Sequence, residues 1–239
     1  MASDREFEPL IDIVKSKLHL FKIYQTAVES VFHEDPVLRT TPPTIHSIKT
    51  RLKDIEHIRE KVARKRSEGE EVTADNLFQK ITDIAGVRVL HLHQQQFELI
   101  HRCIGNQLDR GDWVLHEEAK AYTWDPESRV FFEALGLKVE VKESFYTSIH
   151  YVVKPRKDSE VSCEIQVRTL FEEIWGEIDH AINYPLATGS LSCREQVLAR
   201  LVGAGSRLAD SIFRIHAEEN RPTDEIAKKP NKPDPGDGK

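Results

Sequence analysis

The stretch Val161-Ser-Cys-Glu-Ile-Gln-Val-Arg-Thr169 decides the interpretation of this chain. Apolar residues occupy every second position, at Val161, Cys163, Ile165 and Val167. A period of two predicts a β-strand that buries those side chains and turns the residues between them to the opposite face. That face carries Ser162, Glu164, Gln166 and Arg168. An ordinary solvated strand would show the same pattern, so the neighbouring segments must decide whether these polar residues form a site.

A helix is predicted directly after this strand. Thr169-Leu-Phe-Glu172 has the Thr-x-x-Glu pattern of a capping box, in which both side chains bond to backbone N–H groups at a helix N-terminus. The helix should extend through Trp175 and His180. The polar strand face is therefore expected to lie beside the start of a helix.

Length and composition indicate one folded core with small additions. The chain has 239 residues, of which 39% are hydrophobic and 31% charged, as in a soluble globular protein. Its net charge of −6 argues against a general nucleic-acid coat, which needs a basic surface. The N-terminus lacks an apolar signal core, and no apolar run reaches the length of a membrane span. We therefore expect no membrane association.

The cysteines and histidines predict neither a disulfide framework nor a metal centre. Cys103, Cys163 and Cys193 are odd in number, widely spaced and free of any C-x-x-C pair, which indicates reduced thiols in a cytoplasmic protein. His91 and His93 share one side of a strand, but the sequence offers no third ligand in register. No glycine-rich phosphate loop occurs either.

The first third of the chain is predicted to be helical. Apolar spacing indicates an amphipathic helix over about 6–33, and Pro36 with Thr40-Thr-Pro-Pro43 then interrupts it. A second helix is predicted from Ile45 through Val62, because its apolar residues recur at threes and fours. Its other faces are strongly basic. They form either a solvated face or a binding surface for phosphates.

The middle of the chain predicts an α+β fold. Strands are expected at about 87–91, 113–117, 137–141, 147–153 and 161–167, and helices at about 74–80, 95–109 and 126–135. This pattern predicts a single mixed β-sheet of about five strands flanked by helices, with the last two strands forming a hairpin. Ser192-Cys-Arg-Glu195 should open a long C-terminal helix.

Two acidic residues offer chemistry beyond the fold. Asp83 lies just before a predicted strand, and with Glu164 it could hold Mg²⁺ together with waters and the phosphates of a nucleotide. A turn or helix-cap role would also explain Asp83. Tyr146 and His150 precede and begin the predicted hairpin, where the tyrosine could stack on a base or pack in the core.

Four motifs in order make the chain recognisable. They are Ile81-Thr-Asp-Ile-Ala-Gly-Val-Arg88, Tyr146-Thr-Ser-Ile-His150, Glu164-Ile-Gln-Val-Arg-Thr169 and Trp175-Gly-Glu-Ile-Asp-His180. Over about residues 40–185 the chain resembles the synthetase domain of the RelA/SpoT alarmone family. The resemblance implies a nucleotidyltransferase-like sheet. The resemblance places a synthetase domain over 40–189. The apolar spacing predicts a helical extension over 1–39 and a helix over 190–220, and the prolines and charges predict a disordered tail over 221–239.

The resemblance also implies an activity and a role for each matched residue. The activity is pyrophosphate transfer from ATP to the 3′-hydroxyl of GDP or GTP, which makes guanosine tetra- or pentaphosphate. Asp83 and Glu164 would hold Mg²⁺, and Glu164 would be the general base. Arg88 would stack on adenine. The remaining matches would bind the acceptor: Tyr146, His150, Gln166 and Arg168.

The donor site departs from the family pattern in this alignment. Ser47 matches the serine of the family's basic helix, but the Arg-x-Lys pair expected before that serine falls on Thr41 and Pro43. Arg39 is the nearest replacement, and Arg51 matches a basic position further along. We therefore assign ATP binding to Ser47, Arg39 and Arg51 beside Arg88. The usual neighbours of the acceptor tyrosine are also replaced, by Phe145 and Thr147.

Three functional hypotheses stay open at this point. The first is the guanosine alarmone synthetase. The second uses the same chemistry on adenosine nucleotides or on the 3′ end of tRNA, which alone would make RNA a partner, through the basic residues 49–66. The third is a catalytically silent nucleotide-binding module. The C-terminal helix could pack on the sheet or assemble a homo-oligomer.

Overall fold

The computed structural model describes residues 4–142, 146–183 and 193–219. Within these ranges the strands form one mixed seven-stranded sheet of order β1-β2-β7-β6-β4-β5, with β3 paired to β6. The strands are β1 Ser47–Leu52, β2 Ala85–His91, β3 Val114–Leu115, β4 Lys120–Thr123, β5 Lys138–Val141, β6 Ser148–Lys154 and β7 Cys163–Thr169. The α+β prediction is confirmed, and β6 and β7 form the predicted antiparallel pair.

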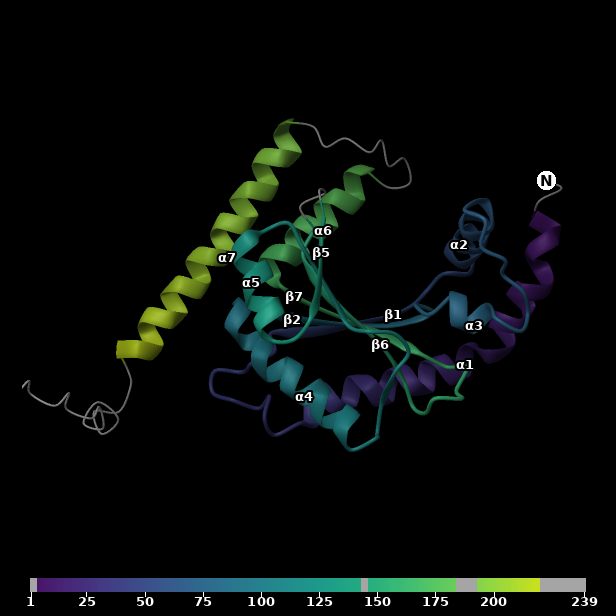
Figure 1. The fold of residues 1–239 in the computed structure, drawn as a ribbon, viewed down its shortest axis with the longest axis horizontal. Helices are drawn as coiled ribbons and strands as arrows, with labels where there is room; N and C mark the ends of the chain where they lie inside the picture. Colours follow the sequence, from purple (N-terminus) through teal and green to yellow (C-terminus); the bar gives the residue numbers. More distant parts are fainter. Residues whose placement is uncertain (1–3, 143–145, 184–192, 220–239) are drawn as a thin grey trace, which may run out of the picture.

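Helices lie on both sides of the sheet (Figure 1). They are α1 Asp4–Glu34, α2 Ile55–Ser67, α3 Leu77–Lys80, α4 Phe97–Asp109, α5 Pro126–Ala134, α6 Leu170–Asn183 and α7 Cys193–Glu219, with the 3-10 turn η1 Gln94–Gln96. α1 and α4 cover one side, and α6 and α2 stand on the other side near opposite ends (Figure 1). Among the described residues, no helix is both long and apolar enough to cross a membrane.

One face of the sheet is the core. The alternating residues of β2, β6 and β7 are buried there against α1 and α4: Val87, Val89, Ile149, Tyr151, Val153, Ile165 and Val167. This is the burial that a period of two predicts. The other face of the same strands carries the polar residues, and it is the side toward α6 and α2.

The predicted helix from Ile45 is wrong over its first part. Residues 47–52 form β1 instead, paired antiparallel to β2 from Ser47 with Leu90 to Leu52 with Ala85. Ile48 and Leu52 satisfy a strand's period of two as well as a helix's spacing of four, and pairing with β2 decides between them. The basic helix starts only at Ile55, after Asp54 accepts a hydrogen bond from the backbone N–H of Glu56 (2.8 Å).

Smaller differences concern the edge of the sheet. The strand predicted at 113–117 is reduced to the two residues of β3, and β4 was not predicted. β4 places Tyr122 opposite Ser148 and Lys120 opposite His150, so it extends the sheet beyond β6. The sheet thus has seven strands where about five were expected.

Within the described ranges, the C-terminal helix packs mainly on α6 and on the turn η1. A Cβ atom added to Gly203 would lie 2.6 Å from the Trp124 ring, and one added to Gly205 would lie 2.7 Å from the Phe171 ring. Glycine at these two positions is what lets α7 approach α6 and the residue before α5 so closely. The opposite side of α7 stays exposed, as discussed below. The tail predicted to be disordered, 221–239, lies outside the described residues.

Candidate active site

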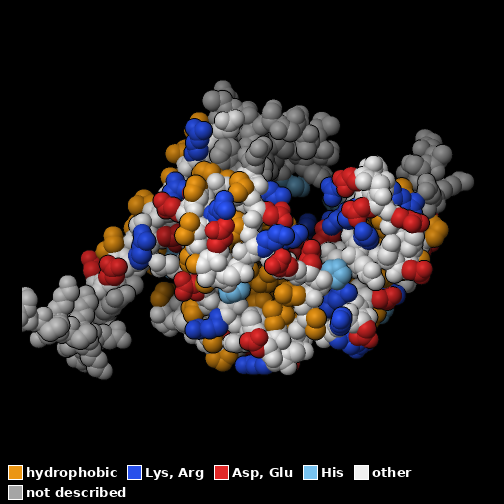
Figure 2. All heavy atoms as spheres, viewed as in Figure 1, with side chains coloured by type: hydrophobic (Ala, Val, Ile, Leu, Met, Phe, Trp, Pro, Cys, Tyr) orange, Lys and Arg blue, Asp and Glu red, His pale blue; other side chains and the backbone are white. Residues whose placement is uncertain are grey.

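The strand register brings the polar residues together on one side of the sheet, which we call the polar face. One row runs across five strands in register: Lys49, Arg88, Gln166, His150 and Lys120. A second row contains Arg51, Gly86 and Glu164. The space-filling view is hollowed above this face, between the part that carries α6 and the part that carries α2 (Figure 2). Basic and acidic side chains gather around the hollow.

β7 supplies the centre of the polar face, and its three polar residues are connected by hydrogen bonds. The Gln166 amide donates to the Glu164 carboxylate (2.8 Å), and its oxygen accepts from Arg168 (2.9 Å). Gln166 also accepts from Arg88 Nε on the neighbouring strand (3.3 Å). The amide therefore fixes the acid and both arginines relative to one another.

Glu164 is a carboxylate at this site. His150 Nδ1 lies 3.2 Å from its second oxygen. Burial acts to raise the pKa of Glu164, but His150 and the hydrogen bond from Gln166 together outweigh it, and the pKa lies below its ordinary value. The negative charge of Asp83 acts in the opposite direction, because that second carboxylate is close enough to interact.

Asp83 is held by two lysines just before β2. The Nζ atoms of Lys53 and Lys61 each lie 2.7 Å from one of its oxygens. Burial acts to raise the pKa of Asp83, but Lys61 and Lys53 outweigh it and lower the pKa to about 2. Asp83 is therefore an ionised carboxylate that two lysines hold in place next to the start of β2.

Arg88 is fixed by two acids of α6. Its Nη1 donates to Glu173 (2.8 Å) and to Glu177 (3.0 Å). Burial acts to lower the pKa of Arg88, but the hydrogen bond to Glu173 and the charges of both acids raise it overall. The guanidinium is thus a permanent cation, held through Nη1 by the two acids and through Nε by Gln166.

Tyr146 is tied to the polar face through its hydroxyl. That oxygen lies 3.0 Å from His150 Nε2 and accepts a hydrogen bond from Arg168 (2.8 Å). The Arg168 guanidinium also lies 5.2 Å from the centre of the Tyr146 ring. The structure therefore joins six of the predicted residues in one cluster: Glu164, Gln166, Arg168, His150, Tyr146 and Arg88.

Ser47 and Arg39 have no described contact with this cluster. Ser47 lies on β1 and bonds to its neighbour His46 (3.1 Å), so the expectation that it belongs to the basic helix is wrong. Arg39 follows α1, donates to the carbonyl of His33 (3.0 Å) and pairs with Glu34. Each is engaged locally.

The position of the basic helix relocates the missing Arg-x-Lys pair. Because that helix begins at Ile55, the residues a few positions before it are Arg51-Leu-Lys53. The same spacing puts His57 where the family has its serine. Arg51 lies on the polar face opposite Gly86, and Lys53 binds Asp83. Arg51 and Lys53 thus have the Arg-x-Lys spacing directly before the basic helix, which Thr41 and Pro43 lack.

Sequence reasoning missed Glu173 and Lys61. Glu173 is almost fully buried and binds Lys49 (2.8 Å), Arg88 and Arg168 (3.3 Å). The available signal was its spacing of four residues from Glu177, which puts both acids on one side of α6. Lys61 was hidden in a run of basic residues that are alike in sequence.

The carboxylates of Asp83 and Glu164 fit Mg²⁺. Within the described ranges, no group of three or more His, Cys, Asp and Glu side chains could enclose a metal ion. Mg²⁺ at phosphate-handling sites is commonly held by one or two carboxylates, with phosphates and waters completing its shell. Two neighbouring carboxylates on a basic face meet that description.

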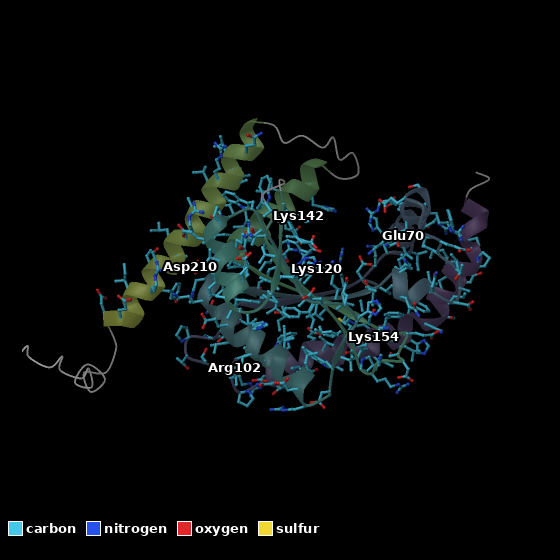
Figure 3. The ribbon with its side chains drawn as sticks, viewed as in Figure 1. Glu70, Arg102, Lys120, Lys142, Lys154 and Asp210 are labelled. Atoms are coloured by element: carbon cyan, nitrogen blue, oxygen red, sulfur yellow. The ribbon has the colours of Figure 1, made fainter. Side chains whose placement is uncertain are left out.

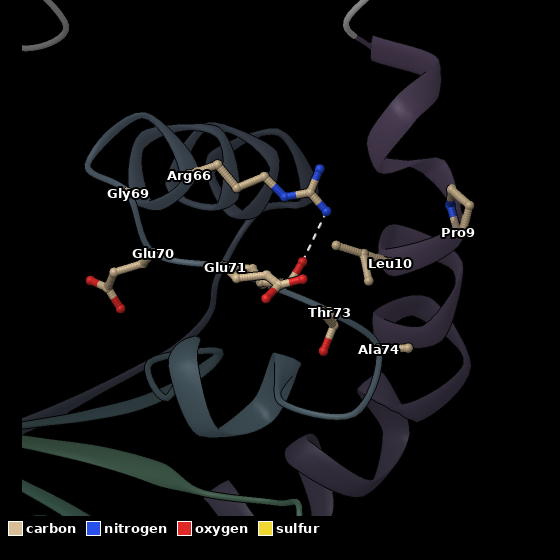
Figure 4. A pocket seen from close by; sticks show the side chains of 9 residues that line it. Pro9, Leu10, Arg66, Gly69, Glu70, Glu71, Thr73 and Ala74 are labelled. Atoms are coloured by element: carbon tan, nitrogen blue, oxygen red, sulfur yellow. Dashed lines mark hydrogen bonds between the residues drawn. The ribbon is translucent and has the colours of Figure 1, made fainter.

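A cavity elsewhere in the molecule shares no residue with the cluster. It measures about 570 Å³ and lies between the start of α1 and the connection from α2 to α3 (Figure 4). Arg66 crosses it to donate to the carbonyl of Val72 (2.9 Å). We therefore place the chemistry on the polar face.

A family model agrees with the site. The model described as the region found in RelA / SpoT proteins matches residues 50–188, more than half of the chain. The chain belongs to the RelA/SpoT family. The matched region of this RelA/SpoT chain contains strands β2, β6 and β7, which carry the centre of the polar face.

Individual relatives are moderately similar to this RelA/SpoT protein. GTP pyrophosphokinase YwaC of Bacillus subtilis (strain 168) is 27% identical over 176 residues, which cover 72% of this chain and 75% of the relative. The structure of small alarmone synthetase 1 from Bacillus subtilis has a TM-score of 0.60 at 24% identity, covering 87% of this chain and all of that one. Small alarmone synthetase 2 from Bacillus subtilis has a TM-score of 0.57 at 21% identity, covering 85% and 98%. These structures share the fold.

Proposed function

We propose that this protein transfers pyrophosphate from ATP to the 3′-hydroxyl of GDP or GTP. The observation that carries the proposal is the ionised Glu164 between two groups of residues suited to two nucleotides. One group is the cations around Asp83, and the other is His150 with Tyr146. The relatives support the assignment, since YwaC is named a GTP pyrophosphokinase. Small alarmone synthetase 1 has been solved with its product pppGpp and with AMPCPP.

The donor nucleotide is assigned to the side of β1 and β2. Lys53, Lys61 and Arg51 supply the positive charge that a triphosphate requires on leaving water. Arg88 presents a guanidinium plane for adenine, held at one edge by the acids of α6. Asp83 and Glu164 would hold Mg²⁺, which when bound offsets the negative charge of the phosphates.

The acceptor nucleotide is assigned to the side of β6. The Tyr146 ring offers a stacking surface for the base, and Arg168 holds that ring in place. His150 is within reach of the acceptor's phosphates or ribose. Its contact with Glu164 then orients the carboxylate toward the acceptor's hydroxyl.

Glu164 performs the proton transfer. Its carboxylate takes the proton of the 3′-hydroxyl while that oxygen forms a bond to the β-phosphorus of ATP. The bond between this phosphorus and the oxygen bridging it to the α-phosphate breaks, and AMP leaves with the electron pair. The cations around the phosphates spread the developing charge, and positioning supplies the remaining rate enhancement.

A second acceptor class is favoured by one observation. Lys120 continues the central row of the polar face beyond His150, and Lys142 Nζ lies 4.6 Å from the centre of the Tyr122 ring. Both lysines are labelled in Figure 3: Lys120 is on β4, and Lys142 directly follows the edge strand β5. An aromatic ring with two cations next to the acceptor site would suit a longer, polyanionic acceptor such as an RNA 3′ end.

Transfer from labelled ATP to a panel of acceptors tests these assignments. The panel contains GDP, GTP, AMP, ADP, ATP and tRNA, with Mg²⁺ present throughout. We expect label on GDP or GTP and stoichiometric AMP. Label on an adenosine nucleotide or tRNA would replace the guanosine assignment, and tight ATP binding without transfer to any acceptor would leave a silent nucleotide-binding module.

A further inference from the structure

Glu173 connects the two halves of the polar face. Its carboxylate lies on α6, and its side chain is only 6% exposed. One oxygen is 2.8 Å from Lys49 Nζ and 2.8 Å from Arg88 Nη1. The other is 3.1 Å from the same Arg88 nitrogen and 3.3 Å from Arg168 Nη1. One acid on a helix thus binds cations from β1, β2 and β7.

These contacts keep Glu173 in place. Burial acts to raise the pKa of Glu173, but Lys49, Arg88 and Arg168 outweigh it, and the pKa lies below its ordinary value. Swinging this carboxylate away would leave three cations without their buried partner, which is strongly unfavourable. Glu173 is therefore a fixed anchor and not a mobile group that substrates displace.

Glu173 contacts one arginine on each nucleotide side, Arg88 on the donor side and Arg168 on the acceptor side. Through Arg88 it reaches the residue assigned to adenine. Through Arg168 it reaches Tyr146, since Arg168 donates to the tyrosine hydroxyl and covers its ring. Gly176, one turn further along α6, shows how closely that helix follows Arg168. A Cβ atom there would lie 2.8 Å from Arg168 Nη1.

We propose that Glu173 is a positioning residue that aligns the donor and the acceptor nucleotides by fixing Arg88 and Arg168 together. The inference rests on the proposed function and adds a residue to it. It also predicts the direction in which nucleotide affinity changes when the charge of Glu173 is removed. Simple electrostatics says that removing a negative charge strengthens the binding of anionic nucleotides. Loss of positioning says that the same change weakens it.

Four variants separate the contact of Glu173 to Arg88 from its contact to Arg168. Glu177→Gln disturbs only Arg88, because Glu177 pairs with Arg88 and is 60% exposed. Gly176→Ala acts directly on Arg168, whose Nη1 the added Cβ would crowd, without any change of charge. Glu173→Gln disturbs both, and Glu173→Asp keeps the charge as a conservative rescue. Thermal unfolding is measured for each variant so that folded protein is compared with folded protein.

Calorimetry with AMPCPP and steady-state kinetics with each substrate varied give the result. We expect Glu173→Gln to weaken AMPCPP binding and to raise the KM for the acceptor, each on the order of tenfold. Glu177→Gln should alter only the donor constant and Gly176→Ala only the acceptor constant. Glu173→Asp should recover part of both. In the Arg88→Ala background, Glu173→Gln should have no further effect on AMPCPP binding.

Other outcomes overturn the inference. Tighter AMPCPP binding by Glu173→Gln would mean that the acid only repels phosphates. A change in the acceptor constant alone would mean that Glu173 contacts the acceptor base directly. If the wild-type protein transfers to no acceptor, the proposed function fails on its own, and the AMPCPP cycle with Arg88 still tests Glu173.

Discussion

At the scale of single residues, Glu164 is the proposed general base, and each of its carboxylate oxygens already has a partner in the protein. His150 and Gln166 each bind one of its oxygens, and the neighbouring charges keep it ionised. Glu164→Gln preserves the shape and removes the basic oxygen, so we expect transfer to fall by about 10²–10⁴-fold while AMPCPP binding persists. Rates and calorimetry on the same preparation check this.

Glu127→Gln is the matched control for that variant. It makes the same chemical change at an exposed position in the first turn of α5. Wild-type turnover by Glu164→Gln would remove the acid from the mechanism. Equal losses in both variants would point to a general effect of charge.

Arg51 tests the relocated Arg-x-Lys pair. It lies on the polar face beside Lys53, whereas Arg39 is engaged with Glu34 at the end of α1. We expect Arg51→Ala to raise the KM for ATP more than the KM for the acceptor, because a triphosphate loses one of its compensating cations. Arg39→Ala should leave both unchanged. A raised KM for ATP in Arg39→Ala, with no change in Arg51→Ala, would assign the donor phosphates to Arg39.

At the scale of elements, the start of α6 links packing to pH. Thr169 and Glu172 make the predicted capping box: the Thr169 N–H donates to the Glu172 carboxylate (2.6 Å), and the Glu172 N–H donates to the Thr169 hydroxyl (3.2 Å). Burial raises the pKa of Glu172 to about 7 from 4.5. Asp210 of α7 acts in the same direction, and Arg168 acts to lower the pKa.

The sign of the resulting pH dependence follows from where the proton is held. The folded protein keeps a proton on Glu172 up to about pH 7, while the unfolded chain releases it near 4.5. Stability from this group is therefore complete below pH 4.5 and is lost as pH rises to 7, by at most about 3 kcal/mol. Glu172→Gln should flatten the melting temperature over that window. An unchanged slope relative to Glu127→Gln would contradict the assignment.

Local sequence patterns correctly predicted the helices and strands whose apolar residues follow a single periodicity. β7 has a clear alternation of two, α6 has its capping box, and Asp125-Pro126 starts α5 as expected, with the Asp125 carboxylate accepting from the Ser128 N–H (2.9 Å). β1 was missed because its apolar spacing suits both periods. Its pairing with β2 is a long-range fact that no local pattern contains.

The difference between local patterns and long-range pairing also explains which site residues the sequence predicted. Glu164, Gln166 and Arg168 were found because one strand presents them together. Glu173 was missed because its partners come from three strands up to 124 residues away in the chain. Only the register of β1, β2 and β7 brings those cations to one acid.

At the scale of the whole molecule, α7 exposes an apolar stripe within the part of the chain that the structure describes. Its members are Val197, Leu201, Leu208, Ile212 and Ile215. Leu201 and Leu208 are 64% and 62% exposed, and they repeat at seven residues with Ile215, as helices that pair along their length do. We propose that a second copy of the chain covers this stripe.

Light scattering on the full chain tests this assembly. We expect a mass of at least two chains, falling to one chain in Leu201→Glu with Leu208→Glu. Because both side chains are exposed in the single chain, the substitutions should leave the fold and its melting temperature nearly intact. A wild-type mass of one chain would assign α7 solely to packing on α6.

The in-register polar face also limits how such a protein can change over time. Exchanging one side chain on β7 alters one contact. Deleting one residue from β7 would instead turn Glu164, Gln166 and Arg168 toward α1 and bring apolar residues to the substrates. A substitution on these strands therefore changes one side chain, whereas a shift of one residue moves all the site residues of that strand off the polar face and should abolish activity. Length variation among functional descendants should therefore be confined to the connections, and a deletion scan through β2, β6 and β7 should show an abrupt boundary at each strand end.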